Sequence, residues 1–125
     1  MAQHNTLGFE GEQAAAEFII KQGWTVRERN WKMGNLEIDI VAETPGRLHI
    51  VEVKTRTHDD KFDPMKAVGP AKQRHLINAA NGYINYYHLK MEIQYDVVIV
   101  VGQPGSFKIQ SVSYTHLTLP TILLV

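Results

Sequence analysis

The stretch that most constrains the fold is residues 34–57, GNLEIDIVAETPGRLHIVEVKTRT. Two runs rich in β-branched and other apolar residues, 36–42 and 48–55, are separated by a Pro45-Gly46 pair that is typical of a turn. Both runs are apolar on both pleat faces over much of their length, as expected of central strands that helices cover. The stretch therefore predicts a β-hairpin in the middle of a helix-covered sheet.

Amphipathic segments with helical spacing lie on either side of this hairpin in the sequence. Residues 7–22 form the first, which Gly23 is placed to end. Its predicted core-facing stripe consists of Phe9, Ala16, Ile19 and Ile20. Residues 70–87 form the second, and Pro70 suits the first turn of a helix. Its predicted core-facing stripe consists of Leu76, Ile77, Ala80, Tyr83, Ile84 and Tyr87.

Three further strands are predicted. Residues 24–31 alternate apolar and polar positions, which favours a strand near a sheet edge. Residues 91–101 contain the run YDVVIVV, which is typical of a buried strand, and residues 107–112 favour a last edge strand. The order α-β-β-β-α-β, with this optional final strand, predicts an α/β sandwich with a mixed central sheet.

The composition limits the kinds of protein that this chain can be. Its 125 residues suffice for one domain with a single core. Thirteen basic and thirteen acidic residues give zero net charge, so a local patch would have to bind a polyanion such as DNA. The chain has no cysteine, no signal-peptide pattern and no apolar run long enough to cross a bilayer. These features predict a soluble cytoplasmic protein without a membrane segment.

The C-terminal residues differ in character from the rest of the chain. Residues 112–121, VSYTHLTLPT, look like the in-frame translation of a sequencing-library adapter, and residues 122–125 would then be read-through. A genuine edge strand is the alternative, which the β-rich composition permits. We predict a single domain over residues 1–111 and a non-native tail over residues 112–125, with the native C-terminus missing.

Polar residues of the predicted hairpin can form a site. Residues two apart in a strand face the same way, so Glu37 shares a face with Asp39 and Glu52 shares a face with Lys54. If strand pairing brings Asp39 beside Glu52, two carboxylates and an ammonium group converge. Carboxylate oxygens are the ligands that Mg²⁺ prefers, and Lys54 could orient a metal-bound water or stabilise developing charge. A Glu-x-Lys strand alone is more often a solvated ion pair.

Two helical residues strengthen the case for a site. Glu12 lies by helical angle inside the stripe of the first helix that should pack on the core, where an unpaired carboxylate is costly. Gln73 lies in the corresponding stripe of the second helix, one turn from its N-terminus. Polar side chains from four elements, each where burial is predicted, favour a ligand site. Pairing of Glu12 with an arginine, or a bond from Gln73 to the backbone, is the alternative.

Basic residues follow these acids in the sequence. The candidates for contact with a phosphate backbone are Arg56, Lys61, Lys66, Lys72 and Arg74. The alternative is a mixed charged surface, because acidic residues interrupt the set. The six histidines show no HExxH or other zinc-ligand spacing, so we interpret them as scattered single residues.

Taken in order, these motifs resemble a known family. Gly11-Glu12, GNLEIDIVA, VEVKTR, AKQRHLINAA and YDVVIV are similar to motifs of the YraN-like group of small bacterial proteins. That group is assigned to the PD-(D/E)xK superfamily and is similar to archaeal Holliday-junction resolvases. The resemblance spans residues 8–101 and implies a single nuclease-like domain with a restriction-endonuclease-like sandwich fold.

The resemblance also implies roles for individual residues. The residues that match the superfamily's helix acid, aspartate, second acid and catalytic lysine are, in that order, Glu12, Asp39, Glu52 and Lys54. Gln73 matches a helix position that often holds a polar site residue. Ile38 stands where the proline of the motif would be, and resolvase-like members commonly lack that proline.

We therefore expect an endonuclease that depends on Mg²⁺ or Mn²⁺ and hydrolyses phosphodiester bonds in DNA, with Asp39 and Glu52 as metal ligands. Branched DNA is one candidate substrate, and symmetrical cutting of a junction would require a homodimer. One alternative is a nucleic-acid-binding or interaction module that keeps the fold without turnover. Another is that the acids form a structural ion-pair cluster.

Overall fold

The computed structural model describes residues 3–58 and 68–113. Within these residues the elements follow one another in the order α-β-β-β-α-β-β. They are α1 (Gln3–Lys21), β1 (Thr25–Met33), β2 (Leu36–Thr44), β3 (Arg47–Arg56), α2 (Pro70–Tyr87), β4 (Glu92–Val101) and β5 (Lys108–Ser113). The predicted α/β class and the order of the elements are confirmed, including the optional last strand.

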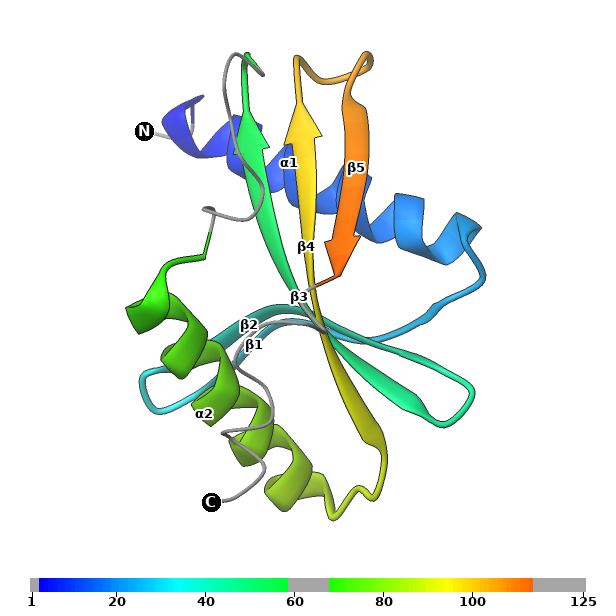
Figure 1. Ribbon diagram of the computed structural model, residues 1–125. Helices are drawn as coiled ribbons and strands as arrows, with labels where there is room; N and C mark the ends of the chain where they lie inside the picture. Colours follow the sequence, from blue (N-terminus) through cyan, green and yellow to red (C-terminus); the bar gives the residue numbers. More distant parts are fainter. Residues whose placement is uncertain (1–2, 59–67, 114–125) are drawn as a thin grey trace.

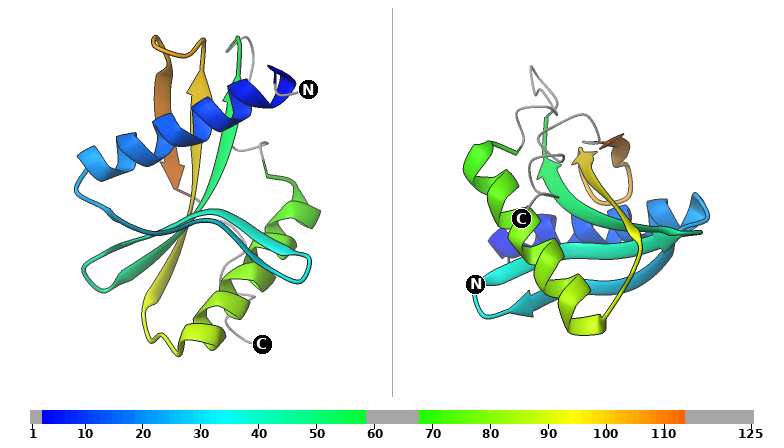
Figure 2. Two further views of the ribbon diagram at one scale, coloured as in Figure 1. Left: turned by 180° about the vertical axis from the view of Figure 1, so that it is seen from behind. Right: turned by 60° about the horizontal axis from the view of Figure 1, so that its bottom comes forward.

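A single mixed sheet, with the strand order β1-β2-β3-β4-β5, forms the centre of the protein. Neighbouring strands are antiparallel except β3 and β4, which are parallel and are connected through α2. Figures 1 and 2 show that α1 lies across one face of the sheet and α2 across the other. The strands β1 and β5 form the two edges, as predicted for both.

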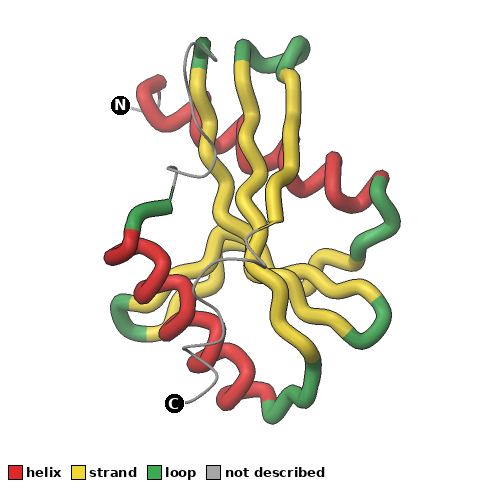
Figure 3. The backbone as a smooth tube through the Cα atoms, in the orientation of Figure 1, coloured by secondary structure: helices red, strands yellow, loops and turns green. Residues whose placement is uncertain are grey.

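The strands β2 and β3 are paired over only part of their length. Their antiparallel ladder begins at the turn that connects them and ends at Ile40 and Val51. Beyond these residues, the first part of β2 stays paired with β1, whereas the last part of β3 stays paired with β4. The sheet therefore divides into two arms, which Figures 1 and 3 show pointing in different directions. We call the point of separation the fork, and its first residues are Asp39 and Glu52.

Side chains of the sheet alternate between two cores. Ile50 packs in the core on the α2 side, and the next residue, Val51, packs in the core on the α1 side. The α2-side core also contains Trp31, Leu48, Leu76, Tyr83 and Val97. The α1-side core also contains Ala15, Ala16, Ile19, Val98 and Val100. Because helices cover both faces, the hairpin is apolar on both.

The stripe of α1 that faces the core is narrower than predicted. The prediction that Phe9 and Ile20 pack on the core is wrong, because these side chains are 65% and 53% exposed. The buried stripe is centred on Gly11, Ala15 and Ile19, which follow one another a helical turn apart. By helical angle Phe9 and Ile20 lie on one flank of that stripe, where the helix no longer rests on the sheet.

Gly11 allows α1 to approach β3 closely. A Cβ atom at this position would overlap the side chain of Thr55 on β3. Glu12 is the next residue of the helix, so the contact between Gly11 and Thr55 sets how far Glu12 stands from the sheet.

A buried polar network lies at the turn end of the hairpin. His49 and Asp96 are each 3% exposed, and the Nδ1 atom of His49 lies 3.0 Å from the Oδ2 atom of Asp96. The other ring nitrogen of His49 lies 2.9 Å from the hydroxyl oxygen of Thr44, and Trp24 stacks on the ring at a centroid distance of 3.8 Å. These partners satisfy the buried histidine, so the network stabilises the hairpin.

Some predictions concern residues outside the described part of the chain. Val112 and Ser113 belong to β5, whereas residues 114–125 are not described, and the non-native tail and the domain boundary at residue 111 stay predictions. Lys61 and Lys66 also lie outside the described residues. Among the helices that are described, none has the length and apolar character needed to span a membrane.

The contact between Gly11 and Thr55 predicts the effect of a small substitution. Gly11→Ala should lower the free energy of unfolding by about 1 to 3 kcal/mol, because the added methyl group pushes α1 away from β3. Urea denaturation measures this change. Gly8→Ala is the matched control, since a Cβ atom there meets nothing within 4 Å and the better helix former should leave stability equal or higher. Equal effects of the two substitutions would contradict the close contact.

Candidate metal and nucleic-acid site

Asp39 is the first residue of β2 beyond the ladder with β3. Its Oδ2 atom accepts a hydrogen bond of 2.9 Å from the backbone N–H of Val53. The carboxylate thus takes the place of the carbonyl group that a neighbouring strand would offer to this amide. Ile38 and Ile40 pack in different cores although they are two residues apart, which shows that β2 twists at Asp39. The twist brings the carboxylate into the fork.

The environment of Asp39 makes its carboxylate hard to ionise. Burial, in the first place, and the negative charge of Glu52, in the second, raise the pKa of Asp39 to about 6. The hydrogen bond from Val53 and the positive charge of Lys72 act in the opposite direction. The influence of Glu52 fits the position of both residues at the start of the fork, and their shared role in a site stays a prediction.

Glu52 is a buried acid with two positively charged partners. Its side chain is 6% exposed, and its Oε2 atom lies 3.3 Å from the Nζ atom of Lys54 on the same strand. Its Oε1 atom lies 3.5 Å from the Nζ atom of Lys72, which extends from the first turn of α2. Lys54 and Lys72 remain partly exposed, so the cluster is open to solvent on the α2 side. The pairing with Lys72 was not predicted.

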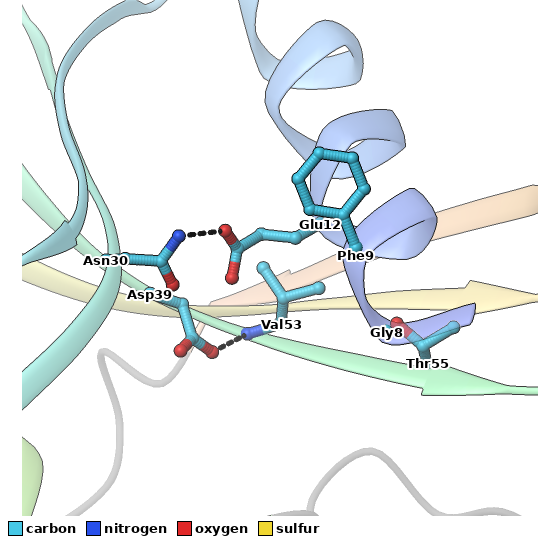
Figure 4. A pocket seen from close by; sticks show the side chains of 7 residues that line it. All are labelled: Gly8, Phe9, Glu12, Asn30, Asp39, Val53 and Thr55. Atoms are coloured by element: carbon cyan, nitrogen blue, oxygen red, sulfur yellow. Dashed lines mark hydrogen bonds between the residues drawn. The ribbon is translucent and has the colours of Figure 1, made fainter. Parts of the chain in front are cut away.

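Glu12 reaches the fork from the other face of the sheet. Its Oε1 atom accepts a hydrogen bond of 2.7 Å from the Nδ2 atom of Asn30 and lies 3.5 Å from the Nη2 atom of Arg29. The arginine pairing that the sequence left as an alternative is therefore present. Glu12 and Asp39 also line one pocket of about 450 Å³, which Figure 4 shows. The other lining residues are Gly8, Phe9, Asn30, Val53 and Thr55.

Asn30 lines the pocket, although its sequence position did not predict it. It lies inside β1 but has a φ angle of 52°, in the left-handed region that few residues other than glycine adopt. This conformation interrupts the alternation of the strand and lets the amide group reach Glu12. The signal in the sequence was an asparagine within a strand, where this residue is uncommon.

The other predicted residues are spread around the fork. Gln73 donates a hydrogen bond of 3.0 Å from its side-chain amide to the carbonyl oxygen of Val68, in front of the first turn of α2. Arg56 is exposed at the end of β3, and Arg74 is exposed on α2. Glu37, two residues before Asp39, is exposed as well. The roles of Gln73, Arg56 and Arg74 in a site stay predictions.

The donor groups at the fork suit a hard divalent cation. Asp39 and Glu52 supply carboxylate oxygens, and the charge repulsion between them is the kind that a cation relieves. Glu12 lines the pocket beside Asp39, but no three acidic or histidine side chains among the described residues are grouped closely enough to hold one ion. A cation at the fork would therefore have Asp39 and Glu52 as its protein ligands, with water or substrate completing the shell.

Comparison with known proteins places these residues in a family context. A family model described as "Uncharacterised protein family UPF0102" matches residues 11–100. A UPF0102 protein of Bacteroides fragilis is 41% identical over 112 residues, which cover 90% of this chain and 93% of that protein. A UPF0102 protein of Flavobacterium psychrophilum is 42% identical over 110 residues, which cover 88% and 92%. The matched region of the family model includes Glu12, Asp39, Glu52, Lys54 and Gln73.

The raised pKa of Asp39 predicts how stability depends on pH. A carboxyl group with a pKa of about 6 in the folded state and 3.8 as its ordinary value binds its proton more tightly when folded. The stability that this tighter proton binding contributes is fully present below pH 3.8 and is lost as the pH rises through about 6. Asp39→Asn removes this loss and keeps an acceptor for Val53. We expect it to raise the free energy of unfolding by roughly 1 to 3 kcal/mol near neutral to mildly alkaline pH, but hardly at all in acid.

Urea denaturation across this pH range measures the difference between the two proteins. Glu37→Gln is the matched control, because Glu37 is an exposed acid on the same strand and its loss should change stability little. A lower stability of Asp39→Asn above neutral pH would show instead that Asp39 is a structural ion-pair partner.

Proposed function

The chain belongs to the uncharacterised family UPF0102, the YraN-like group that its motifs resemble, and we propose that it is a Mg²⁺- or Mn²⁺-dependent endonuclease acting on DNA. The observation that carries this proposal is the meeting of Asp39 and Glu52 at the fork, with Lys54 and Lys72 on the oxygens of Glu52. Phosphodiester hydrolysis needs ligands for a cation and positive charge for the phosphate, and two carboxylates with two ammonium groups offer both. A structural ion pair would need only one group of each sign.

The residues divide the chemistry among them. Asp39 and Glu52 would hold the cation through their carboxylate oxygens, and the chemistry that a divalent cation would supply there is an activated water and neutralisation of charge on the phosphate. Lys54 stands beside Glu52, where its ammonium group can orient the attacking water or stabilise charge on the phosphate oxygens. Lys72 can exchange the carboxylate of Glu52 for a phosphate of the DNA. Arg56 and Arg74, both exposed, extend the positive charge along the path of the backbone.

The protonation of Asp39 sets the pH range of such a reaction. With a pKa of about 6, this carboxyl group is mostly protonated in mild acid and mostly ionised above neutral pH. Only the ionised form is a good ligand for a cation. Cation affinity and cleavage are therefore expected to rise together as the pH rises through this range.

A second candidate function is DNA binding without turnover. The observation that favours it is that Glu12 already bonds Asn30 and pairs with Arg29. Only two acids, Asp39 and Glu52, then remain for a cation, instead of three. Under this alternative Lys54, Lys72 and the exposed arginines bind phosphates, and the acids orient these cations.

Cleavage of labelled DNA tests the choice between the two functions. The substrates are a four-way junction and linear duplex and single-stranded controls, each with Mg²⁺, Mn²⁺ or EDTA. We expect cation-dependent cleavage that Asp39→Asn, Glu52→Gln and Lys54→Met each lower by about 100-fold or more. Cutting of both strands of the junction would in addition require two copies of the chain.

Glu37→Gln is the matched control, because it removes an exposed acid from the same strand and should leave cleavage unchanged. Cleavage that persists in Asp39→Asn or Glu52→Gln would overturn the assignment of the site. DNA binding without cleavage by the native protein under all cation conditions would favour the second candidate.

A further inference from the structure

An aromatic side chain stands exposed at the pocket on the α1 side of the fork. Phe9 is 65% exposed, although it comes from a helix whose neighbouring turns bury Gly11 and Ala15. It lines the same pocket as Glu12 and Asp39, and Figure 4 shows its ring at the wall that α1 provides. The ring gives the pocket a flat apolar wall beside two carboxylates, and such a wall can bind a part of a ligand other than a cation.

The pocket combines groups that suit a nucleobase. Its volume of about 450 Å³ lies in the range of small-molecule sites, and it is lined by one aromatic ring and several polar side chains. Asn30 carries an amide with both donors and an acceptor, and Thr55 carries a hydroxyl group. The carboxylates of Glu12 and Asp39 can accept hydrogen bonds from amino groups on base edges. A flat π-face for stacking and polar groups for the edge are the two requirements for holding an unpaired base.

We infer that this pocket receives an unpaired nucleotide of the substrate, whose base stacks on Phe9 while its phosphate lies at the fork. The inference rests on the proposed function, because it takes the fork as the place of the phosphate. A base within an intact duplex is stacked on its neighbours and is not available to Phe9. The preferred substrates are therefore DNA ends, flaps and other sites with single-stranded nucleotides, and intact duplex is a poor substrate.

The charges around the pocket favour this orientation of the nucleotide. The ammonium groups of Lys54 and Lys72 lie with Glu52 on the α2 side and leave it with excess positive charge, whereas Glu12 carries its carboxylate into the pocket, and Asp39 belongs to both the pocket and the fork. A phosphate is attracted to the first side and repelled by the second, so the less charged base is the part that enters the pocket.

DNA binding, measured by fluorescence anisotropy, tests the inference without requiring cleavage. The probes are a fluorescein-labelled duplex with a short single-stranded overhang of adenines and the same duplex with blunt ends, both in Ca²⁺. The native chain should prefer the overhang. Phe9→Ala should weaken binding of the overhang by about 5- to 50-fold and leave binding of the blunt duplex unchanged, because stacking of one base is lost.

Two further variants sharpen this test. Ile20→Ala is the matched control, because Ile20 is 53% exposed on the same flank of α1 but lies eleven residues, about 16 Å, along the helix from Phe9. It should leave the preference for the overhang intact. Phe9→Trp should retain the preference, and the indole emission that it adds to that of Trp24 and Trp31 should be quenched when an unlabelled duplex with the overhang is added. Because Phe9 and Ile20 are both exposed, all three variants should unfold at the same temperature as the native chain.

Each outcome decides one of the two proposals. Equal binding of both probes by the native chain, or an equal loss for both in Phe9→Ala, overturns the inference even if the protein cuts DNA. A preference for the overhang that depends on Phe9 supports the pocket even if no DNA is cut, in which case the endonuclease proposal alone fails.

Discussion

Two carboxylates that lie close together away from bulk water repel each other, and the site depends on how the fold tolerates Asp39 beside Glu52. The cost is visible in the pKa of Asp39, which burial and the charge of Glu52 raise to about 6. Lys54 and Lys72 offset part of it, because each lies at one oxygen of Glu52. This cluster has little excess charge of either sign, and under the proposed function a cation would take the place of a proton or of an ammonium partner.

The two helices complete the fork from opposite faces of the sheet. The chain enters α2 after β3 and returns through β4, so the parallel pairing of these strands places Lys72, at the start of α2, near the end of β3. On the other face, the absence of a side chain at Gly11 lets α1 approach Thr55 and present Glu12 beside Asp39. Residues distant in sequence thus meet where two central strands separate, and the separation exposes their polar groups without opening either core.

Much of this arrangement follows from regular patterns in the sequence, and the rest depends on departures from them. Strand and helix periodicities predict the hairpin and both helices, and the carboxylate that interrupts an apolar stripe predicts that Glu12 faces the site. Asn30 escapes prediction because its left-handed backbone turns its side chain away from the strand alternation. Phe9 was wrongly predicted to pack on the core, because the helical angle gives the direction of a side chain but not where the sheet beneath the helix ends. The pairing of Lys72 with Glu52 depends on long-range geometry that no local pattern contains.

The hydrogen bond from Val53 to Asp39 makes the state of the fork observable from the main chain. Val53 is a strand residue whose amide proton is bonded to an ionisable side chain instead of a neighbouring strand. Its nuclear magnetic resonance shift and its rate of exchange with solvent deuterium must therefore follow the charge on that side chain. Proton uptake alters this charge, and a bound cation or a displaced lysine would alter the electric field around it. A single backbone resonance is thus an intrinsic spectroscopic probe of the site, and it needs neither an attached dye nor a substrate.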